Sequence, residues 1–278
     1  MDEPIRLQEY GVGIFRGAMT KSALKKVLKK KYITVNDAIA TTATLIKGGE
    51  RIQLCIPEKV RSSKKLVFPL QVLFEDEHLA AIHKPAGILV SGNSFKTIAH
   101  ALSQNLQPSN LPDATIPQPV HRLDYATTGI LLVGKTSSSI RALNRLFEAK
   151  AIEKTYYAVT IGEMKHKGKV TSDIEGKPSH SNYTVVDSVP SERFGRLNLV
   201  KLDPRTGRRH QLRKHLSSIG NPILGDKTYG QEDLILNGKG LYLHAFSIKF
   251  IHPFTHKVMY LKDKLPGRFR NLFKTNDI

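Results

Sequence analysis

The stretch that most constrains this chain of 278 residues is His-Arg-Leu-Asp-Tyr-Ala-Thr-Thr-Gly at 121–129, which runs directly into the apolar segment 130–133. A continuous apolar run after a glycine predicts a buried strand. Asp124 then lies on a loop that leads into this strand, where its carboxylate is held rigidly. The alternative is that Asp124 and Thr127 only shape a turn, because Asp and Thr side chains bond their own backbone in loops.

The charge of the chain is strongly positive. Its 43 Lys and Arg residues stand against 24 Asp and Glu residues, which gives a formal net charge of +19. Such a surplus is typical of nucleic-acid binders, since cationic side chains displace the counterions of phosphates. Basic proteins also bind anionic membranes, so the placement of the charge has to decide between these partners.

No apolar run reaches the roughly 18 residues of a membrane span, and no charged and apolar leader opens the sequence. We therefore expect a cytoplasmic protein that does not bind membranes. The single cysteine, Cys55, excludes an intrachain disulfide and a thiolate metal cluster. Its apolar surroundings at 52–56 predict a small buried side chain without chemistry.

Residues 22–31 have the pattern of an amphipathic, strongly basic helix. Ala23, Leu24, Val27 and Leu28 share one face, and lysines fill the other. Short strands are predicted on its C-terminal side, at 32–35 and 50–54. The candidate RNA-binding residues on this helix are Lys25, Lys26, Lys29 and Lys30. The alternative is that these lysines form an ordinary solvated face.

The basic helix is followed by Val35-Asn36 and then by Gly49-Glu50-Arg51-Ile52. In this pattern residues 17–57 resemble the S-four-like RNA-binding domain, first described in a small-subunit ribosomal protein. The polar stretch 57–65 has no periodicity and is predicted to be an interdomain linker.

The rest of the chain is dominated by strand patterns. They predict strands at 70–74, 79–83, 87–90, 153–162, 169–174, 182–186, 197–202, 241–246 and 248–251. Helices are predicted at 97–106, at 138–148 and after Gly207, where Leu212, Leu216 and Ile219 point inward. The proline-rich stretch 107–119 is predicted to be a loop. Tyr156 and Tyr157 point to opposite faces of one strand, so only one of them can face a cleft.

Four groups of residues follow one another in the second part of the chain. They are His121-Arg122-Leu123-Asp124 with Thr127 and Gly129, Lys154-x-Tyr156-x-Ala158, Thr206-Gly207-Arg208-x-His210-Gln211-Leu212-Arg213-x-His215-Leu216, and Leu243-His244-Ala245 with His252-Pro253. In these motifs and their order the chain resembles the RluA-type pseudouridine synthases, from residue 70 to about 265. It departs from the family at Thr128, where serine is more common, although a hydroxyl is retained.

The resemblance implies an α+β fold. A small α/β RNA-binding domain with its linker, residues 1–62, precedes a mixed, mainly antiparallel β-sheet catalytic domain with flanking helices, residues 63–278. It also implies an isomerase that converts uridines in structured RNA to pseudouridine. Ribosomal RNA is favoured as the substrate, and transfer RNA is the alternative. The base is detached at its N1 glycosidic bond, rotated and rejoined through carbon 5. We expect a monomer that uses no cofactor or metal.

The resemblance also assigns residues to roles. Asp124 is the catalytic carboxylate, Tyr156 stacks on the uracil and takes part in proton transfer, and Arg213 pairs with Asp124. The substrate-binding residues implied in the same motifs are His121, Arg122, Thr127, Arg208, His210 and Gln211.

These residue types suit the chemistry. A carboxylate near the anomeric carbon can act as nucleophile or stabilise positive charge there, and a guanidinium keeps it ionised in a dry site. A base inside an RNA helix must be flipped out before it can react, and an aromatic face recovers part of that free energy by stacking.

Three other functions would use some of the same residues. A histidine metal site is disfavoured, because His210 and His215 are five residues apart on a helix and no His-Glu-x-x-His motif is present. A kinase would need a Gly-rich phosphate loop and Asp-Phe-Gly beside His-Arg-x-Asp, and both are missing from the sequence. The remaining alternative is a non-catalytic RNA-binding or ribosome-assembly factor in which Asp124 is structural.

Overall fold

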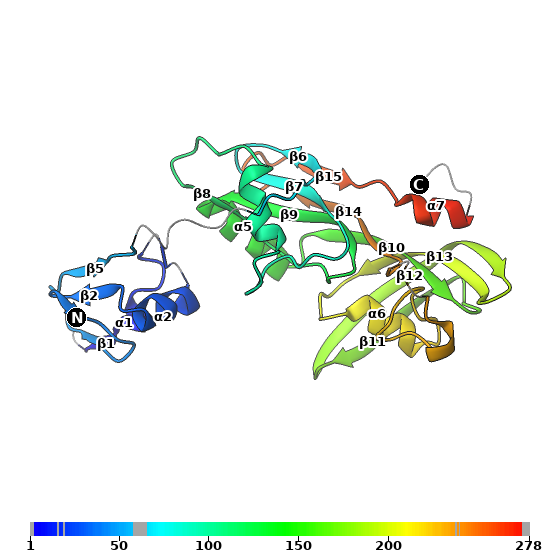
Figure 1. The fold of residues 1–278 in the computed structure, drawn as a ribbon, viewed down its shortest axis with the longest axis horizontal. Helices are drawn as coiled ribbons and strands as arrows, with labels where there is room; N and C mark the ends of the chain where they lie inside the picture. Colours follow the sequence, from blue (N-terminus) through cyan, green and yellow to red (C-terminus); the bar gives the residue numbers. More distant parts are fainter. Residues whose placement is uncertain are drawn as a thin grey trace. The chain divides into compact units, whose positions relative to one another are not determined.

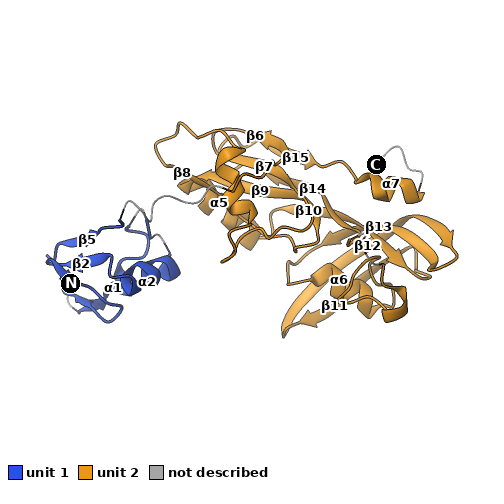
Figure 2. Cartoon of the chain, in the orientation of Figure 1, with its two compact units in different colours: residues 1–64 blue, residues 65–278 orange. Residues whose placement is uncertain are grey.

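The computed structural model describes residues 3–15, 17–18, 20–57, 66–236, 238 and 240–273. The chain divides into two compact units, residues 1–64 (unit 1) and 65–278 (unit 2), as Figure 2 shows. The predicted domain boundary between residues 62 and 63, and nearly all of the predicted linker, lie outside the described residues. The α+β class is confirmed, with one large, mainly antiparallel sheet.

Unit 1 packs two helices against short strands. Its elements are β1 (Ile5–Arg6), α1 (Leu7–Tyr10), α2 (Lys21–Lys29), β2 (Ile33–Val35), β3 (Ala38–Ile39), β4 (Leu45–Ile46) and β5 (Ile52–Leu54). The basic helix is confirmed as α2, which begins where the Thr20 hydroxyl accepts a hydrogen bond from the Ala23 amide at 3.1 Å. Leu24 and Leu28 on its apolar face are buried.

The prediction for Cys55 is wrong, because its side chain is exposed. Ile52, Leu54 and Ile56 are half-buried, whereas Gln53 and Cys55 are exposed. Successive side chains of an extended chain point to opposite sides, so the alternation that buries the leucine turns the cysteine outward.

Unit 2 is built on a ten-stranded sheet (Figure 1). Its strands are β6 (Val72–Glu75), β7 (Leu79–Lys84), β8 (Ala114–Pro119), β9 (Thr128–Thr136), β10 (Glu153–Ile161), β11 (Lys167–Ile174), β12 (Lys177–Ser191), β13 (Gly195–Pro204), β14 (Leu243–Ile251) and β15 (Val258–Lys262). The order is β11-β12-β13-β10-β14-β9-β7-β6, with β15 paired to β14 and β8 to β9. Strands β9 and β14 pair in parallel and the other pairs are antiparallel.

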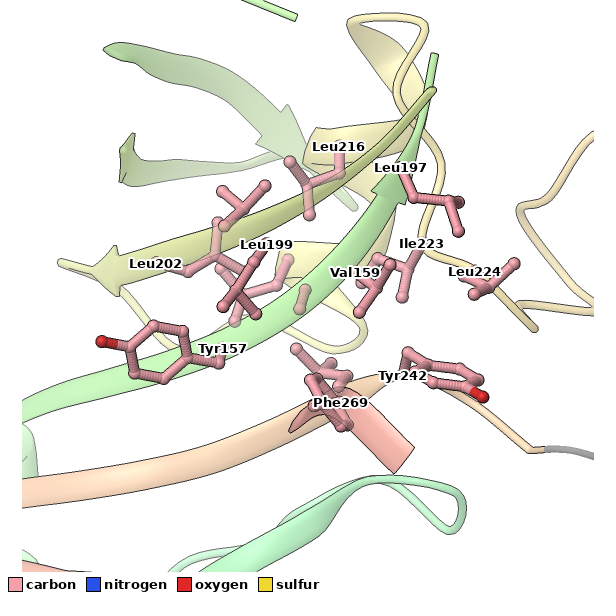
Figure 3. Close-up of a cluster of buried hydrophobic side chains, with 14 of the residues drawn as sticks. Tyr157, Val159, Leu197, Leu199, Leu202, Leu216, Ile223, Leu224, Tyr242 and Phe269 are labelled. Carbon is pink, nitrogen blue, oxygen red and sulfur yellow. The ribbon is translucent and has the colours of Figure 1, made fainter. Parts of the chain in front are cut away.

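Helices pack on both halves of this sheet. They are α4 (Ile98–Ala101), η1 (Leu102–Gln104), α5 (Ser137–Glu148), α6 (Gln211–Ser218), η2 (Glu232–Leu234) and α7 (Gly267–Phe273). Helix α5 packs on β9, and α6 packs on β11 and β12 (Figure 1). Leu216 of α6 and Phe269 of α7 join Tyr157 and Leu199 in one hydrophobic cluster (Figure 3).

Several predictions for unit 2 are wrong in instructive ways. Residues 87–90 form only an isolated bridge from Leu89 to Thr97, because β7 ends at Lys84 and the chain turns at Pro85. Residues 114–119, predicted as loop, form strand β8 despite two prolines, since among the described strands β8 pairs only with β9 and lies at an edge. Ile219 is 38% exposed because α6 ends at Ser218.

Candidate active site

The loop that carries Asp124 ends at the parallel seam between β9 and β14. Thr128 lies opposite His244 and Gly129 lies opposite Ala245 in this pairing. Gly129 has a φ of +119°, and a Cβ at this position would collide with the backbone of Ala245. The close approach of two backbones therefore requires glycine here.

Thr128 fixes the same end of the loop with its side chain. Its hydroxyl lies 2.8 Å from Nδ1 of the fully buried His244. Burial lowers the pKa of His244 to about 4, despite the opposing effect of the Asp263 carboxylate. A neutral imidazole therefore holds the start of β9. A serine at position 128 could make the same hydrogen bond through its hydroxyl.

The carboxylate of Asp124 lines a cavity of about 350 Å³, here called the Asp124 cavity. All nine predicted site residues of unit 2 line this cavity, namely His121, Arg122, Asp124, Thr127, Tyr156, Arg208, His210, Gln211 and Arg213. Four parts of the chain supply them: the loop before β9, strand β10, the loop after β13 and helix α6. The volume of the Asp124 cavity is at the lower end of the range for small-ligand pockets, roughly 300–1,000 Å³.

Two side chains, those of Arg213 and His210, approach the carboxylate of Asp124 without a tight hydrogen bond. Nη1 of Arg213 lies 3.7 Å from Oδ2, and Nε2 of His210 lies 3.7 Å from Oδ1. Burial outweighs the attraction of Asp124 and lowers the pKa of His210, so this ring is neutral at pH 7. Arg213 therefore supplies the full positive charge at this distance.

The expected pairing of Arg213 with Asp124 is incomplete, because Arg213 forms its bidentate pair with Asp226. Nε and Nη2 of Arg213 each donate to one carboxylate oxygen of Asp226 at 2.7 Å. Burial would raise the pKa of Asp226, but hydrogen bonds from Arg213 and from the amides of Thr228 and Tyr229 outweigh it and lower the pKa. Asp226 thereby fixes the guanidinium and leaves Nη1 directed toward Asp124.

Sequence reasoning missed Asp226. It stands after Gly225 in a short connection, where an aspartate is an ordinary turn residue. Its oxygen does accept from the amides of Thr228 and Tyr229, as a turn residue would. The second role, as a partner of Arg213, depends on tertiary packing, and nothing in the sequence indicates it.

A buried lysine under the Asp124 loop was also missed. Lys84 is fully buried at the end of β7, and its ammonium donates to the carbonyl oxygens of Pro85, Tyr125 and Thr127 at 2.9, 3.2 and 2.9 Å. Burial lowers the pKa of Lys84 to about 8, although Asp124 acts against this shift. The ammonium of Lys84 thus ties the segment just after Asp124, at Tyr125 and Thr127, to the end of β7.

Tyr156 faces the cavity while Tyr157 is buried in the hydrophobic cluster, which confirms that only one of the two tyrosines faces a cleft. The β10–β14 pairing shifts register between Thr155 and Tyr156, an irregularity of the kind that re-aims side chains near functional sites. Burial, and then the charge of Asp124, raise the pKa of the Tyr156 phenol. The phenol is therefore protonated at neutral pH.

The remaining cavity residues differ in how free they are to contact a substrate. Nε2 of His121 accepts a hydrogen bond from the Leu132 amide at 2.9 Å, and burial followed by the charge of Lys154 lowers its pKa to about 3. The side-chain amide of Gln211 is engaged by four protein groups, Thr206, Arg208, His180 and Ser181. Both side chains line the cavity, but their hydrogen bonds support its wall.

By contrast, Thr127, Arg122 and Arg208 have polar groups available at the cavity. The buried Thr127 hydroxyl has no hydrogen-bond partner among the described residues. Arg122 and Arg208 are exposed at the rim. A bound polar ligand would satisfy the Thr127 hydroxyl, which is otherwise an unfavourable buried group.

In unit 1, the predicted lysines lie on the polar side of α2 and at its C-cap, Lys30. Lys25, Lys26, Lys29 and Lys30, here called the lysine face, are all exposed. Lys25, Lys26 and Lys29 also line a shallow hollow with Lys21. The apolar side of the same helix is buried, so these lysines are held on one surface.

The histidines of the other motifs serve the fold. His215 is buried and lies within hydrogen-bond distance of the hydroxyls of Ser179 and Ser181.

Across the described ranges, no group of three or more His, Cys, Asp and Glu side chains could hold a metal ion. None of the described helices is long and apolar enough to cross a membrane.

Comparison with known proteins connects this site to a reaction. The family model for RNA pseudouridylate synthases matches residues 78–218. Ribosomal large subunit pseudouridine synthase C of Rickettsia felis is 33% identical over 288 residues, which cover 92% of this chain and 92% of that protein. Ribosomal large subunit pseudouridine synthase D of Nitrosomonas europaea is 32% identical over 274 residues, covering 89% of this chain and 77% of that protein.

Solved structures share the fold. The human RNA Pseudouridylate Synthase Domain Containing 4 protein matches with a TM-score of 0.57 at 25% identity, covering 72% of this chain and 90% of that one. The human RNA Pseudouridylate Synthase Domain Containing 1 protein matches with a TM-score of 0.57 at 22% identity, covering 70% of this chain and 83% of that one. The chain therefore belongs to the RNA pseudouridylate synthases, within the RluA-type family, and is an RNA pseudouridine synthase.

Proposed function

We propose that the chain isomerises uridines of large-subunit ribosomal RNA, with Asp124 as its catalytic carboxylate. The observation that carries the assignment is the position of Asp124 in a cavity with an aromatic ring, Tyr156, and a fixed guanidinium, Arg213. The names of the bacterial relatives support ribosomal RNA as the substrate class.

The reaction exchanges one bond to the ribose for another. The N1–C1′ bond breaks and a C5–C1′ bond forms, while the proton on C5 leaves and N1 gains one. Atoms balance within the substrate and water, so no oxidant or reductant is needed. Asp124 acts at C1′, either as nucleophile or by stabilising the positive charge that develops there.

The neighbours of Asp124 divide the remaining work. Arg213 stabilises the ionised carboxylate, and its planar fork is fixed by Asp226, so Nη1 keeps a constant aim. Tyr156 stacks on the flipped uracil and, as a protonated phenol, can donate a hydrogen bond to it. Lys84 holds the backbone of the Asp124 loop from below and is a positioning residue.

The rim and wall of the cavity hold the nucleotide. Arg122 and Arg208 bind phosphates from their exposed positions, and the Thr127 hydroxyl donates to or accepts from the bound nucleotide. His121, His210 and Gln211 shape the wall against which the nucleotide lies.

The lysine face of unit 1 binds phosphates of the same RNA and positions it without taking part in the chemistry. The protein works as a monomer in the cytoplasm and needs no cofactor or metal. If activity on folded RNA persists in the presence of EDTA, this would support a reaction without a metal ion.

Nucleoside analysis tests the function directly. Unmodified large-subunit ribosomal RNA transcript is incubated with the full chain, digested and analysed for pseudouridine. Conversion at defined uridines is expected, and the same positions should lose pseudouridine in cells without the protein. RNA binding without any new nucleoside would favour the non-catalytic alternative.

A further inference from the structure

A second and larger hollow, of about 1040 Å³, opens beside the Asp124 cavity. The two share the rim residues Phe147, Lys154, Pro204, Thr206, Gly207 and Arg208. Beyond this rim the hollow extends over β13, β10, β14 and β15, which are consecutive neighbours in the sheet. We call it the flanking groove. It is contiguous with the candidate active site, and its volume is at the upper end of the range for small-ligand pockets, roughly 300–1,000 Å³.

The lining of the flanking groove is basic. It has six Lys or Arg side chains against three carboxylates. One of the carboxylates, Asp203, already accepts a hydrogen bond from the Thr155 hydroxyl at 2.9 Å. Among the described residues neither Lys201 on β13 nor Lys249 on β14 forms an ion pair, so both ammonium groups are available to an anion.

An exposed aromatic ring lies in the same groove. Tyr260 on β15 is 55% exposed and stands opposite Lys249 in the β14–β15 pairing. The ammonium of Lys262 lies 4.8 Å from the centre of its ring. Cationic side chains interleaved with an exposed aromatic ring are the features of surfaces that bind single-stranded nucleic acid, where phosphates meet the cations and bases stack on the ring.

We propose that the flanking groove binds the single-stranded nucleotides next to the reacting uridine, with phosphates on Lys201 and Lys249 and a base on Tyr260. This inference rests on the proposed function, since it continues the path of the RNA out of the Asp124 cavity across the shared rim. A stacked base and two phosphate contacts are tolerant of sequence. The groove therefore adds affinity for unpaired RNA beside the target and leaves the choice of uridine to other contacts.

The test uses the full chain with two groove variants. One is the double variant Lys201→Gln and Lys249→Gln, and the other is Tyr260→Ala. The probe is a labelled oligouridylate of about 12 nucleotides, a length that single-strand binding surfaces cover. The matched control for charge is Lys167→Gln with Lys169→Gln, two exposed lysines of β11 outside both cavities.

The double variant is expected to weaken binding and to reduce the slope of log affinity against log salt by about 1.4, which is about 0.7 for each contact with a single strand. Tyr260→Ala should weaken binding about 5-fold or more, the lower bound for loss of one stacked base, without a change in slope. Tyr260→Phe should bind as the wild type does, because the ring is kept. The control should not differ from wild type.

Tritium release from C5 of uridine in unmodified ribosomal RNA transcript separates this inference from the proposed function. If wild type releases no tritium, the proposed function fails. If wild type converts the RNA, while both groove variants bind the oligouridylate with the affinity and salt slope of the control, the flanking groove is not an RNA-binding surface.

Discussion

The lysine face of α2 and the Asp124 cavity, the two surfaces proposed to contact RNA, are built in opposite ways. The lysine face consists of neighbours on one helix, so six consecutive positions of sequence, 25–30, contain it entirely. The Asp124 cavity and its support combine residues as far apart as Lys84 and Asp226. A surface that presents charge needs only local structure, whereas a site that aims one carboxylate needs partners from distant parts of the chain. Changes in the two regions should therefore affect different quantities.

The largest effect is expected at Asp124. Asp124→Asn keeps the shape of the side chain and removes its charge, so conversion should fall on the order of 10⁴-fold or more, as for loss of a catalytic nucleophile. RNA affinity and thermal stability should stay near wild type. Tritium release and filter binding measure the two properties side by side. Turnover by the purified variant above a no-enzyme control would remove Asp124 from the catalytic role.

The difference between a surface on one helix and a site assembled from distant residues explains what the sequence could predict. Asp124, Tyr156 and Arg213 stand in motifs with fixed spacing, and the cavity brings all three together. Helix α2 follows from its periodicity. Partners across the fold leave no such pattern, because in the sequence Lys84 follows the predicted strand 79–83 as the first residue of a Lys-Pro-Ala-Gly turn, and Asp226 stands in a short connection.

The wrong secondary-structure predictions also arise because tertiary contacts leave no pattern in the sequence. Strand β8 contains prolines that local propensity assigns to loop, and it exists because the edge of β9 is available for pairing. The hydrogen bonds of Gln211 are likewise not visible in the sequence, which predicts a substrate-binding residue; in the structure its amide contacts four protein groups at the wall of the Asp124 cavity. In both cases tertiary contacts decide, and sequence periodicity does not report them.

The next largest effect tests whether distant support is needed to aim the carboxylate. Arg213→Lys keeps a positive charge but cannot form the bidentate pair with Asp226, so kcat should fall about 100-fold or more, with little change in RNA affinity. Asp226→Asn should lower kcat as well, although Asp226 does not line the Asp124 cavity. It should also destabilise the fold by about 3 kcal/mol, because a buried guanidinium loses its charged partner.

Single-turnover rates and urea unfolding measure these effects. Arg145→Lys, an exposed substitution on α5, is the matched control and should leave both unchanged. Wild-type kcat in Arg213→Lys would contradict the need for a planar fork and reduce Arg213 to a general cation.

A smaller effect is expected at Lys84, on stability more than on chemistry. Lys84→Met leaves three carbonyl oxygens without their donor, which should destabilise the protein by about 3 kcal/mol at pH 7. The folded pKa of Lys84 is about 8, below its ordinary value of 10.5. Between these values the unfolded state binds more protons, so this group makes the free energy of unfolding rise with pH.

Urea unfolding at pH 7 and at pH 10 measures both parts of this prediction. As pH rises, the wild type should gain stability relative to Lys84→Met, and below pH 7 their difference should be constant. A difference that does not depend on pH from 7 to 10 would show that Lys84 titrates as an ordinary exposed lysine.

The smallest effect on chemistry is expected at the lysine face. A fourfold variant, Lys25→Gln, Lys26→Gln, Lys29→Gln and Lys30→Gln, keeps good helix formers and the buried side of α2, so unit 1 should stay folded. It should weaken binding of long structured RNA and lower the salt slope by about 3, since each lost phosphate contact lowers it by roughly 0.7 to 0.9. At saturating RNA its kcat should equal that of the wild type, because phosphate contacts position the RNA while the chemistry takes place in the Asp124 cavity. The charge-matched control replaces Lys165, Lys167, Lys169 and Lys177 by Gln, four exposed lysines of unit 2, and should keep the wild-type salt slope. If the two fourfold variants lose affinity and slope equally, net charge rather than the lysine face attracts the RNA, and unit 1 has no positioning role.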